Sequence, residues 1–116
     1  MARLGMESSD KRASTRLPIE TTVRYGSEGE MTAGRGFDLS ENGMGFTGSR
    51  LFPVGTTLEI EFLMNTSHAG WFRVKGGVRR SAQDGMGVEF LNVGSAVKAQ
   101  ILKAIYQELA MQRRQA

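Results

Sequence analysis

The chain of 116 residues contains no cysteine and only one histidine. The absence of cysteine excludes a disulfide framework and any zinc or redox site built on thiolates. The single histidine, His68, falls in a predicted turn, so neither a Ser-His-Asp triad nor a histidine metal cluster is supported. These absences lead us to expect no catalytic residue, no metal, no cofactor and no enzymatic activity.

A long apolar run is also absent. A membrane-spanning helix needs about 18 or more consecutive apolar residues, and no such stretch is present. The N-terminal residues are polar and mixed in charge, unlike a secretory signal, which is basic and then apolar. We therefore expect a cytoplasmic protein that does not insert into a membrane.

The composition is that of one globular domain, with 40% hydrophobic residues, 23% charged residues and a net charge of +3. This charge is too small to indicate bulk nucleic-acid binding. Eleven of the fifteen basic residues are Arg. The planar guanidinium suits phosphate groups and guanine edges better than an ammonium does. GC-rich codon usage explains the same bias, and both explanations stay open.

From residue 17 onward, apolar side chains alternate with polar ones, which is the pattern of half-buried strands. The segments predicted as strands are Leu17–Tyr25, Met31–Phe37, Gly43–Thr47, Thr57–Met64, Trp71–Arg80 and Met86–Phe90, with turns at 26–29, 65–70 and 83–85. Glu59 and Glu61 are predicted to face Arg73 and Lys75 across a hairpin. Short, regularly spaced antiparallel strands favour a small barrel, because closure removes exposed edges.

The period changes near the C-terminus. Val97, Ile101, Ile105 and Leu109 recur every four residues, which predicts an amphipathic helix over about residues 94–113. Gly94 and Ser95 stand where an N-cap belongs. We expect the apolar stripe to pack on the barrel and the helix to cap one barrel end. Residues 1–15 show no periodicity and are predicted to form a flexible arm, with a single domain over 16–114.

Two short motifs lie near the start of the chain. Arg12 and Arg16 form an Arg-x-x-x-Arg pair at the junction of the arm and the first strand. Two guanidiniums in this place can close on an anion. A chain with eleven Arg produces about one such pair by chance, however, and a solvated basic arm is the favoured explanation of the pair taken alone.

The second motif is Asp-x-Ser-x-x-Gly, from Asp38 through Ser40 to Gly43. Asp38 can accept hydrogen bonds from a purine edge, and Ser40 offers a hydroxyl and a backbone N–H. Asn42 and Gly43 both tolerate a positive φ, so we expect a tight turn that points backbone donors at a ligand. A plain Ser-stabilised β-turn is the alternative interpretation.

In this order and at this spacing, the two motifs resemble those of the PilZ family. The resemblance extends over residues 11–109 and includes Val78-Arg79-Arg80 and Gly87-Val88-Glu89-Phe90. It implies a mainly β fold, a six-stranded antiparallel barrel with a C-terminal capping helix, and a bacterial receptor for the second messenger cyclic di-GMP.

The resemblance also implies roles for individual residues. Arg12 and Arg16 would contact the phosphates and guanine bases, Asp38 would accept from guanine N–H groups, Ser40 would hydrogen-bond to base or phosphate, and Gly43 would permit the turn. Lys11 and Asn42 are secondary candidates. Asn42 stands where Gly is common in the family. The roles of Arg79 and Arg80 stay open.

We expect ligand binding to order the arm and so to signal to an unidentified protein partner in a monomer or weak dimer. One alternative is a PilZ-like interaction module that works without ligand. The other is a small barrel that binds single-stranded nucleic acid, which needs an exposed aromatic surface. Most of the six Phe fall on inward positions, and Trp71 is expected to be a half-buried anchor, so no nucleic-acid partner is expected.

Overall fold

The computed structural model describes residues 17–64 and 70–115. The described chain forms six strands followed by one helix. The elements are β2 (Leu17–Ser27), β3 (Glu30–Ser40), β4 (Gly43–Gly48), β5 (Thr57–Leu63), β6 (Trp71–Ala82), β7 (Gly85–Leu91) and α1 (Ser95–Gln115). The six expected strands and the expected helix are therefore all present. The arm and the predicted turn at residues 65–69 lie outside the described residues.

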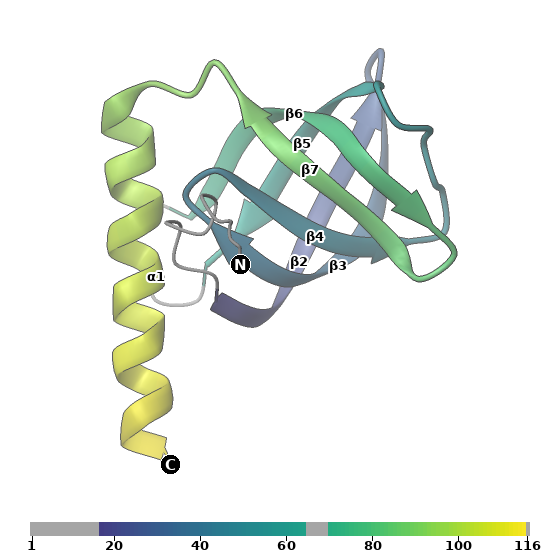
Figure 1. Ribbon diagram of the computed structural model, residues 1–116. Helices are drawn as coiled ribbons and strands as arrows, with labels where there is room; N and C mark the ends of the chain where they lie inside the picture. Colours follow the sequence, from purple (N-terminus) through teal and green to yellow (C-terminus); the bar gives the residue numbers. More distant parts are fainter. Residues whose placement is uncertain (1–16, 65–69, 116) are drawn as a thin grey trace, which may run out of the picture.

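The six strands close into an antiparallel barrel in the order β2-β3-β4-β7-β6-β5. Sequential strands pair through hairpins except for β4 and β5, and closure comes from the pairs β2–β5 and β4–β7. Figure 1 shows β3, β4 and β7 side by side across the front of the barrel. The mainly β fold class that the sequence predicts is thus confirmed.

The barrel interior is filled by the inward-facing residues of each alternating strand. On β5, for example, Leu58, Ile60 and Phe62 are at most 1% exposed, whereas Glu59 between them is exposed. Aromatic rings fill the centre: Phe62 stacks on Phe72 and Phe90 with centroids 5.3 and 6.0 Å apart. Such close packing of large apolar groups is the main source of stability in a domain of this size.

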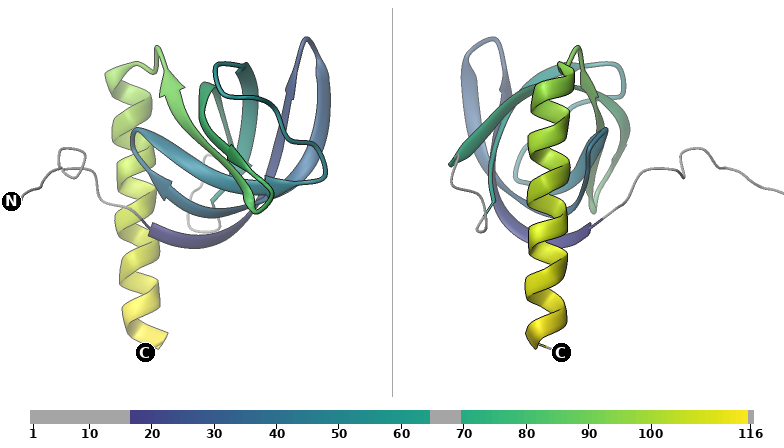
Figure 2. Two further views of the ribbon diagram at one scale, coloured as in Figure 1. Left: turned by 45° about the vertical axis from the view of Figure 1, so that its right-hand side comes forward. Right: turned by 90° about the vertical axis from the view of Figure 1, so that its left-hand side faces the viewer.

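Helix α1 lies across one open end of the barrel, and its C-terminal part extends beyond the barrel wall (Figure 2). The stripe predicted from the sequence is the contact face: Ile101 and Ile105 are fully buried, and Val97 and Leu109 are partly buried against the core. The carbonyl of Gly94 accepts the first helical hydrogen bond, from the N–H of Lys98 (3.0 Å). The expected N-cap and the capping of the barrel by the helix are therefore confirmed.

The predicted bounds of every element differ from the observed ones by one to three residues, and the differences in β2 and β3 change the hairpins. Strand β2 continues to Ser27, and the turn consists of Glu28 and Gly29, both with positive φ (57° and 86°). Two consecutive residues with positive φ match the right-handed twist of a hairpin, so the strands remain paired up to the turn. Strand β3 continues three residues past Phe37, which places part of the second motif inside a strand.

Candidate functional site

The second sequence motif forms the β3–β4 hairpin. Asp38 and Ser40 lie in the last three residues of β3, and Gly43 is the first residue of β4, directly opposite Ser40. The sequence suggested that Asp38 ends a strand and that a turn follows. That boundary was wrong, because the ladder continues to Ser40 and the turn contains only Glu41 and Asn42. The first motif, with Lys11, Arg12 and Arg16, lies outside the described residues.

A β-bulge positions Asp38. Between Gly36 and Asp38 the pairing with β4 shifts by one residue, so that Phe37 is the extra residue. Bulges turn side chains away from their regular direction, and here Asp38 is half-buried beside Phe37 on the barrel exterior. The N–H of Gly45 donates to Asp38 Oδ1 at 2.9 Å. This bond orients the Asp38 carboxylate.

The Ser40 side chain holds the hairpin turn together. It is fully buried, and its Oγ accepts a hydrogen bond from the N–H of Asn42 at 3.2 Å. The same hydroxyl lies 3.4 Å from the carbonyl of Gly43 as a donor. The interpretation of this segment as a Ser-stabilised turn therefore holds in the structure. A contact between Ser40 and a ligand stays a prediction.

Gly43 is required for a reason other than the one predicted. Neither Asn42 nor Gly43 has a positive φ, so the expectation of a left-handed turn at these two residues was wrong. Instead, a Cβ at Gly43 would lie 2.2 Å from the carbonyl oxygen of Val88. Because that oxygen belongs to the backbone of β7, only glycine allows β4 and β7 to approach as closely as they do.

The hairpin turn is also tied to the end of the barrel and to the helix. The carbonyl of Asn42 accepts from the N–H of Phe90 at 2.8 Å, and its side-chain oxygen accepts from Lys98 Nζ at 3.1 Å. Lys98 lies in the first turn of α1, so Asn42 joins the motif to the C-terminal helix. No sequence pattern indicates this link, because it forms only when the barrel closes.

The registers of four strands place Asp38, Gly45, Gly87 and Arg80 in one row across the barrel exterior. Asp38 pairs with Gly45, Gly45 with Gly87, and Gly87 with Arg80. We call this the Asp38–Arg80 row. Its two central residues are glycines, so no side chain of the row stands between the carboxylate and the guanidinium. Three strand spacings of about 4.8 Å separate the two ends.

Arg79 and Arg80 both extend over this exterior surface into solvent. Arg79 Nε lies 2.9 Å from Glu89 Oε1, and Arg80 Nη1 lies 3.3 Å from Asp84 Oδ1, with every one of these side chains at least half exposed. Exposed ion pairs are weak, worth about 0–1 kcal/mol. Replacing the carboxylate partner of either guanidinium with another anion therefore costs little free energy.

Among the described residues, no three His, Asp or Glu side chains are placed to hold a metal ion. No helix within the described ranges is long and apolar enough to cross a membrane.

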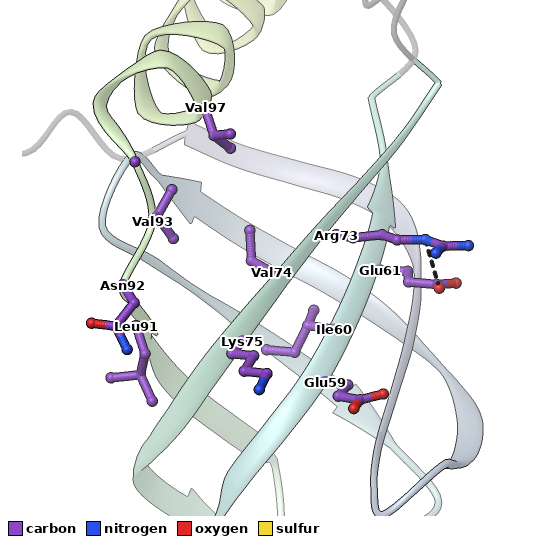
Figure 3. A pocket seen from close by; sticks show the side chains of 11 residues that line it. Glu59, Ile60, Glu61, Arg73, Val74, Lys75, Leu91, Asn92, Val93 and Val97 are labelled. Atoms are coloured by element: carbon purple, nitrogen blue, oxygen red, sulfur yellow. Dashed lines mark ion pairs between the residues drawn. The ribbon is translucent and has the colours of Figure 1, made fainter.

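A hollow of about 560 Å³ lies elsewhere, between β5, β6 and the start of α1 (Figure 3). Its wall is apolar and its rim is charged, with Ile60, Val74, Val93 and Val97 inside and Glu61 and Arg73 at the edge. Arg73 Nε pairs with Glu61 Oε2 at 3.1 Å, as the predicted cross-strand arrangement requires. None of the described site residues predicted from the sequence lines this hollow.

The sequence analysis overlooked Phe37 and the glycines of the row. Phe37 is 38% exposed, whereas the other five Phe are buried in the core, so the expectation that most Phe face inward is confirmed. The signal was present as two Gly-x-Gly pairs, Gly43-Met44-Gly45 and Gly85-Met86-Gly87, in which an apolar inward residue separates two outward glycines. Trp71 is 40% exposed, in agreement with a half-buried anchor.

Solved structures with the same fold include several PilZ domains. The PilZ domain of YcgR from Escherichia coli with c-di-GMP is 19% identical, with a TM-score of 0.72 over 91% of this chain and 97% of that one. YcgR in complex with c-di-GMP from the same organism is 20% identical, with a TM-score of 0.75 over 90% of this chain and 49% of that one. The Bacillus subtilis inhibitor of motility, MotI/DgrA, is 16% identical, with a TM-score of 0.71 over 88% of this chain and 53% of that one.

The chain thus spans about half the length of MotI and of the longer YcgR structure. No curated protein sequence matches it. At these identities the structures show a shared fold. The family model of the PilZ domain, however, matches residues 10–107, most of the chain and both motifs. The chain therefore belongs to the PilZ domain family.

Proposed function

We propose that this PilZ domain is a receptor for cyclic di-GMP that binds the ligand with its two motifs together. One observation carries the proposal. Leu17 pairs with Leu39, which lies between Asp38 and Ser40, and Pro18 pairs with Asp38 itself. Since Arg16 is bonded to Leu17, the first motif joins the barrel at the second motif.

Chain length supports the same conclusion. Consecutive Cα atoms are 3.8 Å apart, and an extended chain spans at most about 3.3–3.6 Å per residue. Arg16 is one residue from Leu17, and Arg12 is five, a reach of roughly 17 Å. Both guanidiniums can therefore reach a ligand lying on the exterior of β3 and β4.

The chemistry of the described surface suits a guanine nucleotide. Asp38 provides an acceptor for the N–H groups of a guanine edge, and Arg80 at the other end of the Asp38–Arg80 row provides a donor for phosphate or for guanine O6 and N7. Ser40 and Gly43 fix the hairpin that holds Asp38 in place. Lys11 and Asn42 are additional candidates for contacts. Two YcgR structures with this fold were solved with c-di-GMP, which supports the same ligand here.

The proposed signal is the ordering of residues 1–15. A dianionic ligand that pairs with Arg12 and Arg16 would hold the arm against the barrel domain of residues 16–114. The changed surface would then be recognised by a protein partner. In this account the domain is a receptor and adaptor in the cytoplasm, with no catalytic step.

Ligand choice and arm ordering are tested in the same preparation. Calorimetric titration should show saturable binding of cyclic di-GMP and much weaker binding of cyclic di-AMP, because adenine presents an acceptor where guanine presents the N1–H that Asp38 receives. Limited trypsin digestion should cleave after Lys11, Arg12 or Arg16 more slowly with ligand than without it. Equal cleavage rates at saturation would overturn arm ordering, and no binding to the folded protein would indicate a ligand-independent interaction module.

The exposed aromatic residues do not favour a nucleic-acid binder. Among the described residues, the three exposed aromatic side chains are Phe37 on β3, Trp71 on β6 and Tyr106 on α1. Continuous binding of a single strand needs several stacking side chains along one groove. Three aromatics on three separate elements do not form such a surface.

A further inference from the structure

We infer that Phe37 is a stacking surface for one guanine base of the bound nucleotide. The inference rests on the proposed function and adds to it a residue that belongs to neither sequence motif. The bulge in β3, the glycines of β4 and β7, and the exposure of the Phe37 ring support it independently.

The Phe37 ring packs on the barrel exterior where glycines make room for it. A Cβ at Gly45 would lie 2.6 Å from the ring, and a Cβ at Gly85 would lie 3.3 Å from it. The ring therefore rests on the backbone of β4 and β7, where any larger side chain would displace it. Phe37 nevertheless remains 38% exposed to solvent.

Exposure of this ring is not explained by the packing of the core. The other five Phe residues are at most 8% exposed, and the bulge places Phe37 outside their cluster. Burying an exposed aromatic ring against another planar apolar group is favourable, and bases stack on aromatic side chains whatever their sequence. The exposed part of Phe37 therefore has the chemistry that a base requires.

The neighbours of Phe37 select guanine among the bases. A Cβ at Gly45, which would contact the ring, would also lie 3.1 Å from Asp38 Oδ1. The ring and the carboxylate therefore both lie beside Gly45 of β4. A base stacked on the ring has its edge near this acceptor. Carboxylates accept hydrogen bonds from N–H groups, and guanine carries them at N1 and N2. Stacking by Phe37 and recognition by Asp38 thus act on one base.

The first test is calorimetric titration of cyclic di-GMP into the wild type and three variants. Phe37→Leu keeps an apolar group over the glycines and removes the aromatic face, so its affinity should fall by about 5- to 50-fold. Phe37→Tyr keeps the face and should stay within about threefold of the wild type. Trp71→Leu is the matched control, since Trp71 is 40% exposed on another part of the barrel and its loss should leave affinity unchanged.

The outcomes separate this inference from the proposed function. No binding of cyclic di-GMP to the folded wild-type protein overturns both. Wild-type binding with unchanged affinity in Phe37→Leu overturns the stacking role alone and assigns Phe37 to covering the glycines.

A second variant gives an answer even if Phe37→Leu does not fold. Trp71 is the single tryptophan of the chain, so the double variant Phe37→Trp/Trp71→Phe carries its only tryptophan at the proposed stacking position. Saturation with cyclic di-GMP should quench or shift its fluorescence, because the base contacts the indole. Binding measured by calorimetry without any change in fluorescence would overturn the inference.

Discussion

Substitution of Gly43 by alanine should strongly destabilise the barrel. The added Cβ would lie 2.2 Å from the Val88 carbonyl oxygen, whereas an ordinary contact begins near 3.4 Å. Strands β4 and β7 must then separate by about 1 Å, which costs about 1–3 kcal/mol as overpacking. Weakening one or two ladder hydrogen bonds adds about 1 kcal/mol. We expect a loss of about 2–4 kcal/mol in the free energy of unfolding, a large part of the usual total.

Gly87→Ala is the matched control for this prediction. Gly87 also faces outward, on the partner strand β7, and its Cβ would meet nothing closer than Arg80 at 3.7 Å. At such a position alanine should leave stability unchanged or raise it by up to about 1 kcal/mol, because it restricts the unfolded chain. Urea unfolding followed by circular dichroism measures both. Equal midpoints for the two variants would refute the reasoning that close backbone contact dictates glycine at position 43.

Three further predictions concern the hairpin, the helix and the surface charges. Ser40→Ala removes the buried acceptor of the Asn42 N–H and should lower the free energy of unfolding by about 1 kcal/mol. An unchanged urea midpoint would show that the turn does not need the hydroxyl. Ile105→Ala leaves a cavity between α1 and the barrel and should lower the free energy of unfolding by about 2–5 kcal/mol. Tyr106→Ala, at the exposed neighbouring residue, is the control and should change it little. A loss below about 1 kcal/mol for Ile105→Ala would contradict a core role for the helix. Arg79→Gln breaks an exposed ion pair and should shift stability by less than about 1 kcal/mol at any salt concentration, so a loss above 2 kcal/mol would show that the pair with Glu89 is structural.

Much of the fold follows from local patterns in the sequence. Each strand core shows a period of two, as in Leu58, Ile60 and Phe62, and the helix shows a period near four from Val97 to Leu109. These periods depend only on which residues face the interior, so they predict element type well. The ends of β2 and β3 were harder to predict, because they depend on turn conformation and on a bulge that cross-strand pairing decides.

The candidate site was predictable only in part. The hairpin motif identified Asp38, Ser40 and Gly43, but their local roles depend on contacts with β7 and α1, which are distant in sequence. Gly43 was assigned to a left-handed turn because glycine is common in turns. The actual constraint is the Val88 carbonyl on another strand. Phe37 was predicted to be part of a strand, and the Gly-x-Gly pairs indicate room on the exterior without showing that a bulge turns Phe37 outward.

The central claim is that both motifs together bind cyclic di-GMP, and one calorimetric comparison tests it most directly. The ligand is titrated into the wild type, into Arg12→Ala/Arg16→Ala and into Arg73→Ala/Arg113→Ala. The last variant removes the same charge from two exposed positions outside the motifs. The account predicts saturable binding in the wild type and the control, and its loss in the first double variant. Equal binding by all three folded proteins would contradict it.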